Sequence, residues 1–64
     1  MPWTTGRCPV SMRHLSVVVR GKAVAIANAL LAAGSDEGRA IRIAIAKAEA
    51  WARRRNLPLR DDER

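Results

Sequence analysis

The side chains that could carry catalysis are few in this sequence and do not form a recognisable constellation. His14 is its one histidine and Cys8 its one cysteine, and they are six positions apart. A general base needs an orienting partner and a substrate site, and a structural zinc site takes four ligands. Asp36 and Glu37 are adjacent at an expected helix start, where capping accounts for both carboxylates. We therefore expect no enzymatic activity, no metal site and no cofactor.

Arginine is the residue type that offers a binding chemistry. Twelve Lys and Arg residues against six acids give a net charge of +6, and the isoelectric point is about 11.4. Guanidinium groups at helical spacing can contact a phosphate backbone. The candidate nucleic-acid contacts are Arg39, Arg42, Arg53, Arg54 and Arg55.

Two alternatives to nucleic-acid binding remain open for these arginines. An arginine-rich and alanine-rich composition is also what a GC-rich coding bias produces. Glu49 lies at helical spacing from Arg42 and Arg53, so it could pair with them on a merely solvated face. The charge is concentrated in residues 1–59, which carry +7, whereas residues 60–64 carry −1.

The length of 64 residues allows one small domain. A domain of this size buries only about 60% of its unfolded surface, so its core is thin. The hydrophobic fraction of 48% argues against disorder. With one cysteine, no disulfide can form within the chain.

Neither a secretory signal nor a membrane span is expected. Residues 1–10 contain two prolines and an arginine and lack an apolar segment. The longest charge-free stretch, residues 23–35, is too short to span a bilayer, and Asn28 interrupts it. These features predict a cytoplasmic protein with no membrane partner.

The first expected helix covers about residues 16–33. Ser16 is a suitable N-cap, and Gly34 can adopt the left-handed conformation that ends a helix. Three β-branched residues and Gly21 weaken the first turns. The expected core stripe of this helix is Val19, Ala23, Ile26, Ala27, Leu30 and Ala33.

The second expected helix covers about residues 36–55. Asp36 or Ser35 would cap it, and Asn56 and Pro58 would end it. The short connection makes the two helices antiparallel neighbours, and small residues at positions 23, 27, 44 and 48 would allow close approach. The expected buried stripe of the second helix is Ile41, Ala44, Ile45, Ala48, Trp51 and Ala52.

Residues 1–15 are expected to form an irregular arm, because Pro2 and Pro9 prevent a long helix. Residues 9–15 could still form one helical turn. The arm, led by Trp3, would cover the open side of the hairpin. The predicted fold class is therefore all-α: an arm packed on an antiparallel two-helix hairpin, in one domain of residues 1–59 followed by a flexible charged tail of residues 60–64.

A second apolar stripe on the first helix needs a cover. Val17, Val24 and Leu31 recur every seven residues, away from the expected core stripe. Either the arm with Trp3 packs over them, or a second copy does so in a symmetric dimer. Leu31→Glu would distinguish the two, since only the dimer would leave a folded monomer. Asn28 lies near this stripe, where it either bonds the arm backbone or is exposed.

Several blocks of the sequence resemble a family of short uncharacterised bacterial proteins. The matching blocks are Met1-Pro2-Trp3, Pro9 to Arg13, Lys22-Ala23, Ile26 to Leu31, Asp36 to Ile41, Ile43 to Ala46 and Trp51. The family pattern is MPW, a YPxSMKNL-like segment, a KAIEIANALL-like helix and a DEGRAI-IAIA-AKEWA-like helix. The resemblance covers residues 1 to about 54. The layout is also distantly similar to ChaB-type proteins, which are labelled cation transport regulators.

The resemblance implies that Trp3 and the arm belong to the domain, and it attaches no activity to any residue. The sequence departs from the family pattern at Ser16 and Val18, where Pro and Glu are usual, and at Gly21, where a charged residue is usual. These departures affect the start of the first helix.

The function expected from the sequence is that of a small interaction or accessory protein. Its partner would be another protein or a second copy of itself, as a homodimer. A nucleic-acid-binding module that uses the basic face of the second helix is the alternative. No small-molecule substrate is inferred.

Overall fold

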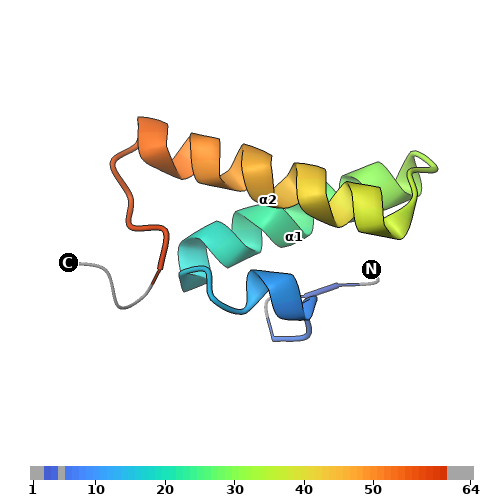
Figure 1. Cartoon of the computed structure of the whole chain (residues 1–64), viewed down its shortest axis with the longest axis horizontal. Coiled ribbons are helices and arrows are strands. Elements are labelled where there is room, and N and C mark those ends of the chain that lie inside the picture. Colours follow the sequence, from blue (N-terminus) through green and yellow to red (C-terminus); the bar gives the residue numbers. More distant parts are fainter. Residues whose placement is uncertain (1–2, 5, 61–64) are drawn as a thin grey trace.

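Two antiparallel helices and one short 3₁₀ turn make up the secondary structure, seen in a computed structural model that describes residues 3–4 and 6–60 (Figure 1). The elements are η1 (Val10–Met12), α1 (Val17–Ala32) and α2 (Glu37–Arg54). No strand occurs among the described residues. The predicted all-α fold class is confirmed. Most of the expected flexible tail, residues 61–64, lies outside the described part of the chain, as do residues 1, 2 and 5.

Local capping sets the bounds of α1. The Ser16 hydroxyl oxygen accepts a hydrogen bond from the Val19 N–H at 3.3 Å. At the other end Gly34 has a φ of 95°, and its N–H donates to the Leu31 carbonyl at 3.0 Å. The Ser35 N–H donates to the Leu30 carbonyl, also at 3.0 Å. This is the Schellman arrangement, in which a left-handed residue satisfies the last carbonyls of a helix.

The helix α2 is bounded in the same way. The Asp36 carboxylate accepts a hydrogen bond from the Arg39 N–H at 3.1 Å, so Asp36 rather than Ser35 is the cap. Asn56, with a φ of 56°, takes the place that Gly34 has after α1. The Leu57 N–H donates to the Ala52 carbonyl at 2.9 Å. Asparagine is the non-glycine residue that best tolerates this conformation.

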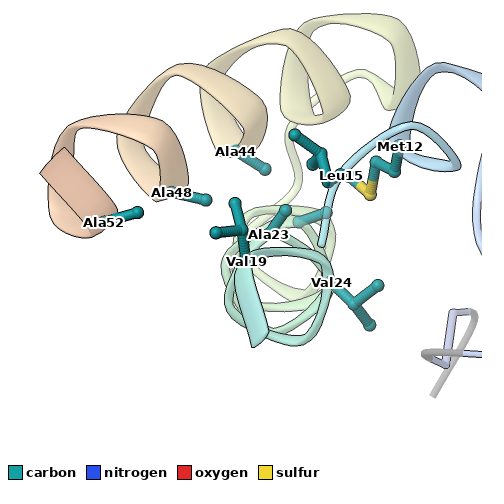
Figure 2. Close-up of a cluster of buried hydrophobic side chains, with 9 residues drawn as sticks. Met12, Leu15, Val19, Ala23, Val24, Ala44, Ala48 and Ala52 are labelled. Atoms are coloured by element: carbon teal, nitrogen blue, oxygen red, sulfur yellow. The ribbon is translucent and has the colours of Figure 1, made fainter. Parts of the chain in front are cut away.

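The two helices meet along a line of alanines. Ala40, Ala44, Ala48 and Ala52 recur every fourth residue of α2 and are fully buried. Figure 2 shows the labelled methyl groups of α2 pointing towards α1, where Val19 and Ala23 lie. Because alanine side chains are small, the two helix backbones can approach closely along this line.

The expected core stripes are therefore partly wrong. Ile41, Ile45 and Trp51 of α2 are only half-buried and pack beside the core cluster. On α1 the correction applies to Ile26 and Leu30, which are half-buried, and to Ala33, which is exposed. The line of buried alanines on α2 also includes Ala40, which the sequence prediction omitted. Bulky side chains do not fit directly between two closely packed helices, so they lie beside this line.

The arm covers the hairpin mainly through its last residues. Met12 and Leu15 are 0% and 1% exposed, and with Val19 they are the largest fully buried side chains. Val10, by contrast, is 76% exposed. The Arg20 guanidinium donates to the Leu15 carbonyl at 3.0 Å, which fixes the connection to α1.

The beginning of the arm is tied to the middle of α1 by one side chain. The Trp3 backbone N–H donates to the Asn28 side-chain oxygen at 3.2 Å, and the Asn28 side-chain nitrogen donates to the Trp3 carbonyl at 2.9 Å. Asn28 is 5% exposed. Of the two alternatives stated for Asn28, the structure shows the bond to the arm backbone.

The chain after α2 returns to the start of α1 (Figure 1). The Ser16 N–H donates to the Leu59 carbonyl at 2.8 Å, and the Ser16 hydroxyl donates to the Pro58 carbonyl at 3.1 Å. Leu57 and Leu59 are half-buried and pack against the core cluster. The sequence predicted the end of the helix here and missed this attachment.

Candidate functional site

The strongest candidate for a functional surface is the outer side of α2. Arg39, Arg42 and Arg53 are exposed there, and at 100° per residue they fall within about 60° of one another around the helix. Arg54, also exposed, follows at the edge. We call Arg39, Arg42, Arg53 and Arg54 the arginine face. In Figure 1 α2 lies along one edge of the molecule with α1 on its inner side, which leaves the opposite side open.

The guanidinium groups of the arginine face are not neutralised by ion pairs with the described residues. None of its guanidinium groups forms an ion pair or a hydrogen bond with residues 3–4 or 6–60. Glu49 is half-buried and does not pair with these arginines within that part of the chain, contrary to the pairing alternative. The Asp36 carboxylate is engaged as the helix cap. Such a surface attracts anions more strongly than a face of mutually neutralised charges.

Arg55, the fifth predicted contact, is placed differently. It is the C-cap residue of α2, and its guanidinium carbon lies 5.1 Å from the centre of the Trp51 ring. The Lys22 ammonium of α1 lies 5.3 Å from the same ring. Both distances are within the range of cation–π attraction. The spacing of four residues between Trp51 and Arg55 could have indicated their contact, whereas nothing local indicated Lys22.

The residues predicted for arm or dimer packing do not share one environment. Val24 is 6% exposed and belongs to the core cluster with Met12. Trp3 is half-buried and packs against that cluster, and Leu31 is half-buried. Val17 is 56% exposed. The chain therefore buries the middle of the second apolar stripe more fully than its N-terminal end.

Cys8 and His14, considered for catalysis or metal binding, belong to the arm and not to α2. Cys8 is half-buried against the core cluster and His14 is exposed. Within residues 3–4 and 6–60, no three His, Cys, Asp or Glu side chains are grouped to hold a metal ion. Neither α1 nor α2 combines the length and the apolar character that a membrane span requires.

Comparison with known proteins finds a similarity to one uncharacterised bacterial protein. The chain is 45% identical over 62 residues to the "Uncharacterized protein YdaT" of Bacillus subtilis (strain 168). The aligned region covers 97% of this chain and 41% of the relative, so the chain spans about two-fifths of that protein's length. This likeness supports the expected relationship to uncharacterised bacterial proteins. No family model matches the chain, and no solved structure matches it.

Proposed function

We propose that this chain is a cytoplasmic, non-enzymatic binding module whose arginine face binds nucleic acid. The observation that carries the proposal is the set of exposed guanidinium groups on α2 without carboxylate partners among the described residues. Arginine forms strong charge-assisted hydrogen bonds with phosphate. Neutralising phosphates also releases condensed counterions, which drives binding at low salt.

The position of the charge supports the proposal as much as its amount. Four exposed arginines lie on one helix whose other side is occupied by the alanine contact with α1. A helix fixes the spacing at which these side chains leave the backbone, so a polyanion can contact several of them at once. The basic residues of the arm, Arg7 and Arg13, are exposed as well but belong to irregular segments.

The test is a fluorescence anisotropy titration of the whole chain with labelled DNA, run separately with single strands and duplexes. Binding at about 50 mM salt that weakens about 100-fold at about 200 mM is expected for four phosphate contacts. Replacing all four residues of the arginine face by Gln should abolish binding. The matched control, Arg7→Gln with Arg13→Gln, should retain most of it. Absence of binding to either form of DNA at low salt would contradict the proposal.

A second candidate function is self-association through the start of α1. Val18 is 57% exposed and its neighbour Val17 is 56% exposed, an arrangement that a second copy could bury. Sedimentation over a range of concentrations would then show a dimer, and Val18→Glu would convert it to a folded monomer. A monomer of the unmodified chain at every concentration would exclude this candidate.

A further inference from the structure

We infer that the arginine face is fitted to double-stranded nucleic acid and that it contacts the two phosphate backbones on either side of the major groove. Arg39 and Arg42 would contact one strand, and Arg53 and Arg54 would contact the other. The inference rests on the proposed function and adds the form of nucleic acid and the way in which it is contacted.

The arginine face is divided into two pairs, one near each end of α2. Arg42 and Arg53, its inner members, are eleven residues apart, which is about 16 Å along a helix. Arg39 and Arg54, its outer members, are fifteen residues apart, or about 22 Å. The major groove is about 12 Å wide. A helix that crosses the groove therefore brings each pair to a different phosphate backbone.

Between the two arginine pairs, the centre of the outer side of α2 is formed by alanines. Ala46 is exposed and Ala50 is half-buried at the centre of that side, and the longer side chains between the pairs, Ile43, Lys47 and Glu49, lie to either side of these alanines. Alanine also has no hydrogen-bonding group with which to read a base edge. Phosphate contacts fix position without reading sequence, so binding should not depend on base sequence.

Glu49 is the one acid in the middle of this side of α2. It lies between the two arginine pairs along the chain and is half-buried. Its carboxylate would face the phosphates across the groove and reduce the affinity by like-charge repulsion. Glu49→Gln should therefore strengthen binding several-fold, and it leaves the arginines and the alanines in place.

The aromatic residues of the chain are poorly placed for a single strand. Binding of single strands relies on aromatic rings on which bases stack, and the chain has two tryptophans and no Phe or Tyr. The Trp51 ring already has Lys22 and Arg55 about 5 Å from its centre. Trp3 packs half-buried against the core cluster, and its backbone is bonded to Asn28 on α1. A duplex also carries twice the axial charge density of one strand.

The experiment compares one labelled DNA strand, alone and annealed to its complement, as ligands of the whole chain at about 50 mM salt. The duplex is expected to bind at least about tenfold more tightly, with a slope of log affinity against log salt of about −3.6. Arg39→Gln with Arg42→Gln, and separately Arg53→Gln with Arg54→Gln, should each reduce the slope to about −1.8. A second duplex of unrelated sequence should bind equally well.

The outcomes separate the inference from the proposed function. Equal or tighter binding of the single strand would overturn the inference and leave the proposed function standing. An unchanged slope after loss of either arginine pair would also overturn the inference, because both pairs must contact phosphate. Weaker binding of Glu49→Gln would contradict the placement of the helix middle over the groove. Failure to bind either ligand would remove both the inference and the proposed function.

Discussion

The two helices of the hairpin differ in how much of their surface the rest of the chain covers. The helix α1 is held from three directions: by the arm through Asn28, by the alanines of α2, and by the returning C-terminal segment at Ser16. The helix α2 has one buried line of alanines and an outer side of exposed arginines. The difference indicates that α1 organises the fold, whereas the outer side of α2 is available to a partner.

The packing of α1 also concentrates stability in few side chains. The alanines between the two helices each bury little area. The largest fully buried side chains are Met12, Leu15 and Val19, so the stability should depend strongly on them. Two of these three belong to the arm. Substitutions around α1 should therefore be costly, while substitutions on the outer side of α2 should change stability little.

The largest effect is expected at the junction of the arm and α1. Leu15 is 1% exposed, and Leu15→Ala should lower the free energy of unfolding by about 3 kcal/mol through lost burial and the cavity left behind. That is comparable with the whole stability of a domain of this size. Chemical denaturation measures the change. Val10→Ala is the matched control at a residue 76% exposed, and equal losses in both variants would contradict the arm's structural role.

A somewhat smaller effect is expected at Asn28. Asn28→Ala removes both side-chain hydrogen bonds to the Trp3 backbone and should cost about 2 kcal/mol, because buried polar groups lose their partners. Asn56→Gly should be nearly neutral, since glycine accepts the positive φ of that position. Thermal unfolding compares the two variants. If Asn28→Ala melts no lower than Asn56→Gly, the arm is not held through Asn28.

The next effect tests the attachment of the C-terminal segment. Ser16→Ala removes the N-cap of α1 and the hydroxyl bond to the Pro58 carbonyl. We expect a loss of about 1 to 2 kcal/mol in the free energy of unfolding. The control is Ser11→Ala, at an exposed position. A Ser16→Ala variant as stable as this control would show that capping and attachment contribute nothing.

The smallest effect is expected on the outer side of α2. Arg39→Gln with Arg42→Gln should change the free energy of unfolding by less than about 0.5 kcal/mol, because both side chains are exposed. Circular dichroism should show unchanged helix content. A loss as large as that of Ser16→Ala would mean that these arginines serve the fold, and the contrast between the two helices would fail.

Local features of the fold could be predicted from the sequence. Ser16, Gly34, Asp36 and Asn56 determine where the helices begin and end, because each acts on the backbone within a few residues. Periodicity placed the arginines on one side of the second helix for the same reason. The spacing of residues along a helix sets the direction in which each side chain leaves it, whatever the rest of the chain does.

Features that depend on distant parts of the chain could not be predicted in the same way. The bond between Ser16 and Leu59 joins residues far apart in the sequence and has no local pattern. The buried line on α2 includes Ala40, whereas the predicted stripe had isoleucines. The prediction ranked isoleucine above alanine by hydrophobicity, but close packing of two helices favours the smaller residue. Whether Glu49 would pair with an arginine depends on rotamers and solvation, which spacing does not determine.

The central claim is that a partner reaches the outer side of α2 while the packing around α1 stays intact. A nuclear magnetic resonance titration of the isotopically labelled chain with duplex DNA at low salt tests this most directly, through the backbone amide shifts of the non-proline residues. We predict changes at Arg39, Arg42, Ala46 and Arg53, with the amides near Asn28 unmoved. Changes confined to the arm or α1, or no changes at all, would contradict the account.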